Sequence, residues 1–306
     1  MSCFLLRLND GKKEIVRLLS RVNPKDLPRL IDWMKNSDEV DDGLIDNQKV
    51  ILQSISEDLR ACLPLEAVLS SESLAIQKTQ QNPQPTLHVD AFLYDEDTVD
   101  TLCEEGKMSR NYCLNCGTHR TAPLEFISHS FSILELQFLF QHVLPDLTGR
   151  LVVDVGSRLG AVLYGGYLYS SAVRLVGVEI SAEFVRLQNM AVEKYGFSDR
   201  IQVIHGDIST QDSLLQNADV LIMNNVFEYF LQPNDQIKAW YFIVHNFRKK
   251  GALLVTVPSL QEALSSHQGG INLSKWVEEL PLDYNVYLGK DGDPDAFKSI
   301  RLYRVL

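Results

Sequence analysis

The sequence has 306 residues, of which 45% are hydrophobic and 23% charged, and its formal net charge is −11. This composition is typical of a globular protein with a sizeable core, and no run of about eighteen apolar residues predicts a membrane span. An acidic chain without a cluster of basic residues is a poor candidate for nucleic-acid binding, because contacts to phosphate dominate that affinity. The N-terminus lacks the pattern of a secretory signal, and five thinly spread cysteines fit a reducing compartment. We therefore expect a cytoplasmic and/or nuclear protein.

The N-terminal part carries apolar side chains at helical spacing. Three stripes predict helices over 12–22, 27–34 and 50–63. A polar, proline-bearing stretch, KTQQNPQPT, follows and is typical of a linker. The acidic run over 90–105 then predicts a solvated face. We predict an N-terminal helical domain over 1–77, and a linker with an acidic, lid-like segment over 78–130.

The rest of the chain alternates strands with helices. Ser132 and Glu135 have the spacing of a capping box and predict a helix that begins near Phe131. Apolar runs predict strands over 151–155, 173–179, 201–204, 218–223 and 252–257. Periodic segments predict helices over 159–169, 182–195, 233–250 and 273–280. Two last strands, over 284–288 and 300–305, are predicted to form a hairpin through the turn GKDGDPD.

This order predicts an α/β fold over residues 131–306. The fold is a doubly wound, mostly parallel seven-stranded sheet with an antiparallel C-terminal hairpin, beside the N-terminal helical domain. Ligands of such sheets bind at the carboxyl ends of the strands. Polar or glycine residues stand at the ends of four predicted strands. Asp154, Gly156, Ser157, Arg158 and Gly160 stand at the end of the first strand, and Glu179 ends the second. Asp207 follows the third strand, and Asn224, Asn225 and Tyr229 follow the fourth. One such residue is often only a helix cap or tight turn, but four polar strand ends together indicate a binding site.

These segments resemble the class I, seven-strand S-adenosylmethionine-dependent methyltransferases. VVDVGSRLG resembles their first motif, which wraps the methionine end of the cofactor, and GVEIS resembles the acidic ribose-binding motif. HGDI is similar to the motif whose acid meets the adenine amino group, and ADVLIMNNVFEYF to the segment that faces the methyl group. The resemblance implies S-adenosyl-L-methionine as cofactor. It implies cofactor contacts from Asp154, Gly156, Ser157, Gly160, Glu179, Ile180, Asp207, Ile208 and Asn224, and catalytic roles for Asn224, Asn225 and Tyr229.

Two residues depart from the family pattern. Arg158 stands where the first motif usually has its second glycine, so its side chain has to point away from the cofactor or narrow the pocket. Tyr229 stands where the segment after the fourth strand often has histidine. A methyltransferase-like scaffold or regulator without activity therefore stays open as an alternative to an enzyme. A nicotinamide-dependent enzyme is disfavoured, because the closing hairpin suits methyltransferases better.

The acceptor is less constrained than the cofactor. Amine methyltransferases of DNA and RNA commonly have prolines after strand four, whereas Asn224 is followed by Asn225. This difference disfavours a nucleic-acid acceptor. The same asparagines and the GVE of the second strand are similar to non-SET histone lysine methyltransferases. We expect N-methylation of a protein side chain, with a small molecule as the alternative acceptor.

A CxxCG turn precedes the methyltransferase-like region. Cys113 and Cys116 could form a zinc site with Cys103 and His119, although no second CxxC pair exists. The alternative, which we prefer, is a lid without metal over 111–130.

Overall fold

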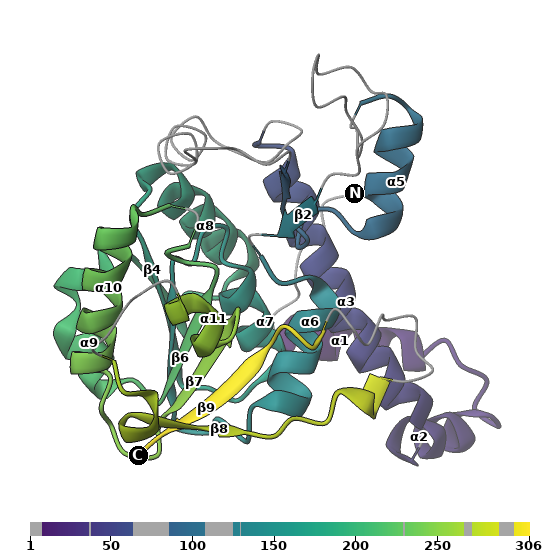
Figure 1. Ribbon diagram of the computed structural model, residues 1–306. Helices are drawn as coiled ribbons and strands as arrows, with labels where there is room; N and C mark the ends of the chain where they lie inside the picture. The colour runs from purple at the N-terminus through teal and green to yellow at the C-terminus, as the bar shows by residue number, and fades with distance from the viewer. Residues whose placement is uncertain are drawn as a thin grey trace.

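The computed structural model describes residues 8–36, 38–63, 86–107, 125–128, 130–228, 230–265, 271–287 and 297–306. Its centre is a seven-stranded sheet in the order β5-β4-β3-β6-β7-β9-β8 (Figure 1). The parallel strands are β3 (Leu151–Val155), β4 (Arg174–Glu179), β5 (Ile201–His205), β6 (Val220–Asn224) and β7 (Leu253–Val257). Strand β9 (Arg301–Val305) is antiparallel to both β7 and β8 (Val277–Leu280). The predicted mostly parallel, seven-stranded sheet with an antiparallel end is therefore confirmed.

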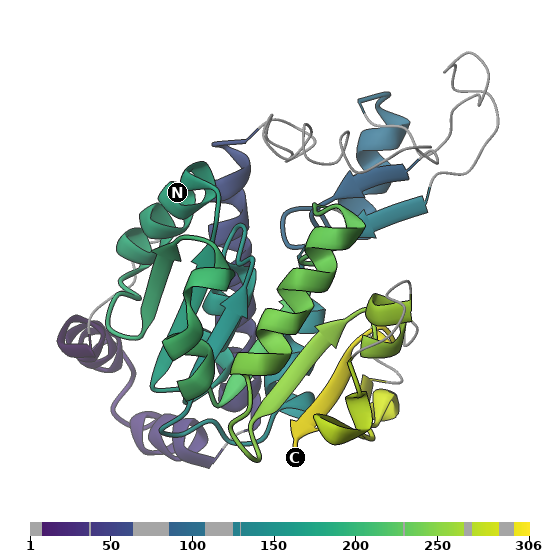
Figure 2. The same cartoon turned by 60° about the vertical axis from the view of Figure 1, so that its left-hand side comes forward.

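Helices cover both faces of the sheet, as Figures 1 and 2 show. One face is covered by α3 (Asp38–Arg60), α6 (Ile133–Phe138), α7 (Ala161–Tyr169) and α8 (Ala182–Tyr195). The other face is covered by α9 (Asp212–Asn217), α10 (Pro233–Asn246) and α11 (Leu260–Ser265). No helix among the described residues is long and apolar enough to cross a membrane.

Strand residues alternate between the two faces because successive side chains of a strand point in opposite directions. Val152 belongs to the core under α7 and α8, whereas Val153 belongs to the core under α9 and α10. Val220 and Leu221 of β6 divide in the same way. All four side chains are fully buried, so the apolar runs that predicted these strands reflect burial on both faces.

The helix boundaries follow local capping. The predicted capping box is present, because Ser132 Oγ accepts a hydrogen bond from Glu135 N at 3.2 Å and Glu135 Oε2 accepts one from Ser132 N at 2.7 Å. Helix α8 spans the predicted residues and ends at Gly196, whose φ of +73° is the left-handed conformation that favours glycine.

The last predicted elements are wrong in detail. The predicted helix over 273–280 is a short 3₁₀ turn, Leu273–Lys275, followed by strand β8, and the predicted strand over 284–288 is a 3₁₀ turn, Tyr284–Tyr287. Backbone pairing with β9 outweighs local periodicity here, because each residue of β8 lies opposite a residue of β9. Glu278 and Arg304, which lie opposite each other, also form an ion pair at the surface.

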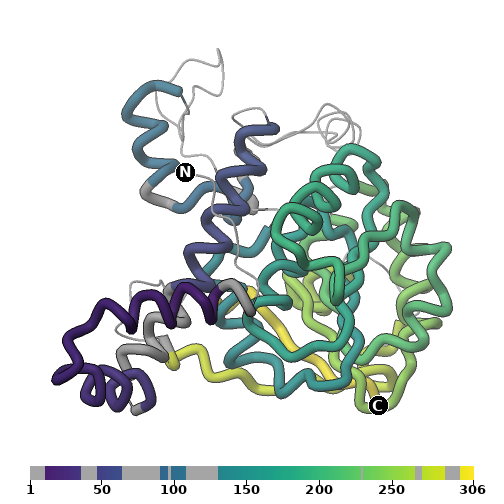
Figure 3. The backbone as a smooth tube through the Cα atoms, turned by 180° about the vertical axis from the view of Figure 1, so that it is seen from behind, coloured from purple at the N-terminus to yellow at the C-terminus, as the bar shows by residue number. Residues whose placement is uncertain are grey.

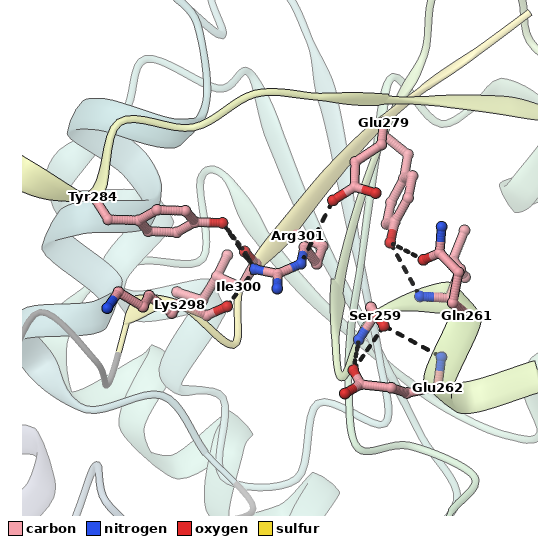
Figure 4. A network of polar contacts seen from close by, with 10 residues as sticks. Ser259, Gln261, Glu262, Glu279, Tyr284, Lys298, Ile300 and Arg301 are labelled. Atoms are coloured by element: carbon pink, nitrogen blue, oxygen red, sulfur yellow. Dashed lines mark hydrogen bonds and ion pairs between the residues drawn. The ribbon is translucent and has the colours of Figure 1, made fainter. Parts of the chain in front are cut away.

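Figure 4 shows how the β9 end of this region is fixed. Arg301 Nε lies 3.5 Å from Glu279 Oε1, and Arg301 Nη1 donates to the Tyr284 hydroxyl at 2.9 Å. The Tyr284 hydroxyl in turn donates to Ile300 O at 2.9 Å. Ser259 and Glu262 cap α11 in the same view.

The N-terminal region is helical, as predicted. It contains α1 (Leu8–Leu19), α2 (Leu27–Asn36) and α3, which begins twelve residues before the predicted start at Val50. Figure 3 shows α1 and α2 on the side of the molecule away from α9 and α10. The second half of α3 packs into the core of the sheet through Leu52, Ile55 and Leu59, which are fully buried. The domain boundaries at 77 and 130 stay predictions.

The segment between the two predicted domains contains a second, parallel pair of strands. Strand β1 (Thr86–Val89) pairs with β2 (Glu125–Ser128), and α5 (Glu96–Glu104) follows β1. In Figures 1 and 2 these elements lie at the upper end of the view. The acidic run over 90–105 was predicted to form a solvated face, and Asp95, Asp100, Glu104 and Glu105 are exposed as predicted. Asp90 is the exception among these acids, because it is fully buried. Its charge is balanced by a tertiary partner, Arg158, which local sequence does not reveal.

Candidate functional site

The turn after β3 requires glycine at two positions. Gly156 has a φ of +67° and Gly160 a φ of +84°, both in the region that L side chains avoid. A side chain at Gly160 would also place its Cβ 2.7 Å from the Tyr164 hydroxyl. A Cβ at Gly156 would lie 3.2 Å from Val226, so the segment after β6 lies directly against this turn.

Asp154 is a buried carboxylate at the end of β3. Within the described chain its side chain accepts no hydrogen bond, although the residue is only 4% exposed. Burial, reinforced by the neighbouring Glu179 carboxylate, raises the pKa of Asp154 well above its usual range. Such a group favours either protonation or a cationic ligand.

Glu179 ends β4 and is tied to two backbone amides. Its Oε2 accepts a hydrogen bond from Arg158 N at 2.8 Å, and its Oε1 accepts one from Ser181 N at 2.8 Å. The side chain is buried. The carboxylate is thereby held between the turn after β3 and the start of α8.

Gln188 of α8 holds the turn after β3 from the opposite side. Its Oε1 accepts from Ser157 Oγ at 2.9 Å and its Nε2 donates to Arg158 O at 2.7 Å. All three residues are buried. The turn that carries the predicted methionine-binding residues is therefore fixed by both β4 and α8.

The predicted adenine-side residues lie at the surface. Ile180 is 67% exposed, and Asp207 is exposed, whereas the neighbouring Ile208 is buried. Asp207 Oδ1 accepts from Ser209 N at 2.8 Å, so its side chain also caps the short 3₁₀ turn Ile208–Thr210.

The segment after β6 contains the predicted catalytic residues. Asn224 lies at the end of β6, and Asn225 has a φ of +50°. Asn225 Nδ2 donates to Asn224 Oδ1 at 2.9 Å, and its backbone N donates to Val257 O at 2.7 Å. Tyr229 lies outside the described residues. The structure thus places two of the three predicted catalytic residues side by side at the carboxyl edge of the sheet.

A small cavity lies where these groups meet. It has a volume of about 20 Å³, which is room for about one water molecule. It is lined by residues of the β3 turn, of β6, of α7 and of the chain before α6: Ser130, Phe131, Asp154, Val155, Gly156, Ser157, Ala161, Val162 and Asn224. Asp154, Gly156, Ser157 and Asn224 therefore come together, while Glu179, Ile180, Asp207 and Ile208 lie outside this cavity.

Ser130 and Asp90 at this edge were missed by the sequence analysis. Ser130 Oγ donates to Asp90 Oδ2 at 2.6 Å, and Asp90 forms a buried ion pair with Arg158. The apolar FLY sequence after Asp90 was a signal that the acidic run begins in a buried segment. Arg158 was recognised as unusual, but its partner lies 68 residues away in the sequence.

The proposed zinc ligands fall almost wholly outside the described residues. Cys113, Cys116 and His119 are not described, and Cys103 is a half-buried free thiol of α5. In the part of the chain that the structure covers, no group of three or more metal-ligating side chains gathers.

No protein-family model and no curated protein matches the sequence. Among solved structures, the chain is similar to an RNA methyltransferase from Salinibacter ruber in complex with S-adenosyl-L-homocysteine, at 17% identity and a TM-score of 0.35, over 56% of this chain and 87% of that one. It is also similar to a methyltransferase from Geobacter sulfurreducens, at 15% identity and a TM-score of 0.36, over 82% of this chain and 95% of that one.

The strand order of the chain itself defines the fold. Numbered along the sheet domain, β5-β4-β3-β6-β7-β9-β8 is 3-2-1-4-5-7-6, with the seventh strand inserted antiparallel. The glycine-bearing turn and the acidic ends of successive strands lie at its carboxyl edge, where such sheets bind ligands. The sheet domain has the class I, Rossmann-like methyltransferase fold.

Proposed function

We propose that this protein is an S-adenosylmethionine-dependent methyltransferase. The observation that carries the proposal is Asp154, a buried carboxylate without a hydrogen-bond donor in the described chain, beside a glycine turn at the carboxyl edge of the sheet. The methionine end of S-adenosylmethionine carries an ammonium and a sulfonium. A buried carboxylate at this place fits that pair of positive charges.

Glu179 and Asp207 carry hydrogen-bond acceptors of the kind that the ribose and adenine of the cofactor would need. Glu179 is held rigidly by two amides, and each of its carboxylate oxygens can accept a further hydrogen bond, as from a ribose hydroxyl. Ile180, directly after Glu179, and Asp207, after the neighbouring strand β5, lie at the surface on the side proposed for adenine. The cavity at Asp154 has room for about one water molecule, so we propose that the residues covering it move when the cofactor binds.

S-adenosylmethionine, when bound, supplies a methyl group activated by its sulfonium. The task of the chain is then to align the acceptor with that methyl group and to exclude water. Asn224 and Asn225 follow β6 beside the turn that carries Gly156, so their side-chain amides are proposed to orient the acceptor. Tyr229 is proposed as a third acceptor-side group.

We further propose a nitrogen of a protein side chain as the acceptor. The net charge of −11 favours a basic protein segment over a nucleic acid, because like charges repel phosphate. The absence of proline after Asn224 also differs from the pattern of nucleic-acid amine methyltransferases. A small molecule is the alternative acceptor.

Transfer of a labelled methyl group tests the proposal. The full chain is incubated with labelled S-adenosylmethionine and a cell extract divided into protein, RNA and small-molecule fractions. We expect label in the protein fraction with the wild type and its loss with Asp154→Ala. Label only in RNA or small molecules would overturn the proposed acceptor, and no label in any fraction would count against an active enzyme.

A second candidate, a methyltransferase-like scaffold, is favoured by two observations. The cavity at Asp154 is small, and Arg158 occupies a turn where methyltransferases usually have glycine. A scaffold would bind the cofactor without turnover, or not bind it. Binding without label transfer to any fraction would support this reading.

A further inference from the structure

Arg158 extends from the cofactor-binding turn to a segment outside the sheet domain. Its φ of +44° is unusual for a residue with a side chain, and the side chain is buried. The guanidinium lies 5.1 Å from the centre of the Phe184 ring and forms an ion pair with Asp90. The residue therefore connects the turn after β3 to the chain that follows β1.

Asp90 gathers hydrogen bonds from both connections of the β1–β2 pair. Its Oδ1 accepts from Phe92 N at 3.0 Å and Leu93 N at 3.2 Å, which follow β1. Its Oδ2 accepts from Ser130 Oγ at 2.6 Å, which follows β2, and from Arg158. The carboxylate is fully buried, so each of these bonds compensates a charge withdrawn from water.

We call residues Asp90–Tyr94 and Ser130–Phe131 the strap. Phe92, Leu93 and Phe131 are each buried, and the Phe92 ring lies 6.2 Å from the ring of Tyr164 in α7. Ser130 and Phe131 line the small cavity together with Asp154 and Asn224. The strap thus packs over the carboxyl edge of the sheet where the methionine end of the cofactor is proposed to lie.

The adenine side is open while the methionine side is covered. Ile180 and Asp207 are exposed, whereas Asp154 is buried and lies beside the cavity of about 20 Å³. Breaking the buried pair by removing one partner would leave an uncompensated charge. The strap therefore resists opening as long as Arg158 and Asp90 stay paired.

We propose that Arg158 and Asp90 form a latch that holds the strap over the methionine pocket, so that the latch sets the rate at which S-adenosylmethionine and S-adenosylhomocysteine enter and leave. The inference rests on the proposed function and assigns a positioning role to the residue that departs from the family motif. The latch acts on both association and dissociation, because both require the strap to open.

The experiment measures exchange of S-adenosylhomocysteine with the full chain by stopped flow. Arg158→Gly restores the usual motif residue at a φ that suits glycine, and we expect its association and dissociation rates both to rise at least about tenfold, with a smaller change in Kd. Arg158→Lys, which keeps the charge, should stay closer to the wild type. Arg150→Ala removes an arginine that pairs with Asp219 at the opposite ends of the strands, and it should leave both rates unchanged.

Amide hydrogen exchange without ligand gives a second readout. In Arg158→Gly the amides of Phe92 and Leu93 should exchange faster than in the wild type, while those of β3 stay protected. If Arg158→Gly does not fold, Asp90→Asn carries the same test, since it keeps the size of the side chain and removes its charge.

Equal exchange rates in wild type and Arg158→Gly would overturn the latch and leave the proposed function standing. Absence of S-adenosylhomocysteine and S-adenosylmethionine binding by the wild type and every variant would overturn the proposed function and the latch together.

Discussion

Single residues at the carboxyl edge of the sheet determine what this protein can bind. Asp154 shows why composition alone does not reveal a site: the sequence predicts an acid at a strand end, but only the fold shows that it is buried without a donor among the described residues. Glu179 differs, since two amides already hold its carboxylate. The site thus contains one carboxylate that is structurally satisfied and one that is not.

Asp154 leads to a prediction about stability and binding together. Its raised pKa means that ionisation is less favourable in the folded than in the unfolded chain, so the cost to folding grows as the pH rises above the unfolded value of about 3.9. Asp154→Asn is expected to raise the free energy of unfolding of the ligand-free protein at neutral pH. The same variant should bind S-adenosylmethionine about tenfold to a hundredfold more weakly, as loss of a charged hydrogen bond predicts.

Chemical denaturation measures the expected gain in stability, and calorimetry measures the expected loss of affinity. Asp212→Asn changes an aspartate in the first turn of α9 and serves as the control for the binding measurement. Lower stability of Asp154→Asn at neutral pH would contradict the account of its burial.

Elements meet at this edge through contacts that the sequence does not predict. Strands β3 to β7 and helix α8 follow from apolar runs, capping and glycine, because each of these acts within a few residues. The β8 strand and the role of the strap depend on partners far away in the chain, such as Arg304 for Glu278 and Arg158 for Asp90. Local periodicity therefore predicted most of the sheet and failed where contacts with residues far along the chain determine the structure.

Gln188 provides a test of how α8 supports the site. Gln188→Leu removes both hydrogen bonds to the turn after β3 and leaves Arg158 O without its donor from α8. We expect a loss of about 1–3 kcal/mol in the free energy of unfolding and weaker cofactor binding. Gln53→Leu on the exposed side of α3 is the matched control and should change neither the stability nor the binding. An unchanged Gln188→Leu variant would show that the turn does not depend on α8.

Asp219 joins the amino ends of three strands and makes stability depend on pH. Partial burial acts to raise the pKa of Asp219, but hydrogen bonds from Leu151 N at 2.8 Å and Lys249 Nζ at 2.7 Å, together with the charge of Lys249, lower it overall. The stability from this lowered pKa is fully present above the unfolded value and is lost as the pH falls through the folded one.

Denaturation midpoints measured between pH 7 and pH 3 should therefore drop, and they should drop less in Asp219→Asn. If the denaturation midpoints of wild type and variant fell equally with pH, the lowered pKa of Asp219 would not be a source of the pH dependence.

In the molecule as a whole, helix α3 and the sheet share one core, whereas α1 and α2 expose apolar side chains such as Leu18 and Trp33. The sequence predicts a separate helical domain because the periodic segments precede a polar linker. The fold shows that α3 contributes Leu52, Ile55 and Leu59 to the core beneath α6, α7 and α8. A sequence read in segments cannot show this, because the buried face of an amphipathic helix does not identify its partner.

This shared core predicts one cooperative unfolding transition for α3 and the sheet. Leu52→Ala is expected to cost about 2–5 kcal/mol and to shift the main transition, because the side chain is fully buried. Leu18→Ala on α1, where the side chain is 61% exposed, should have little effect. A separate early transition in Leu52→Ala, with the sheet transition unmoved, would indicate that α3 unfolds independently.

The proposed function depends on binding of S-adenosylmethionine at the carboxyl edge of the sheet. Isothermal titration of the purified full chain with S-adenosylmethionine tests it most directly, with Glu179→Ala and Asp154→Ala measured alongside. We expect saturable binding at one site by the wild type and weaker binding by both variants. No heat of binding by the wild type at millimolar cofactor would contradict it.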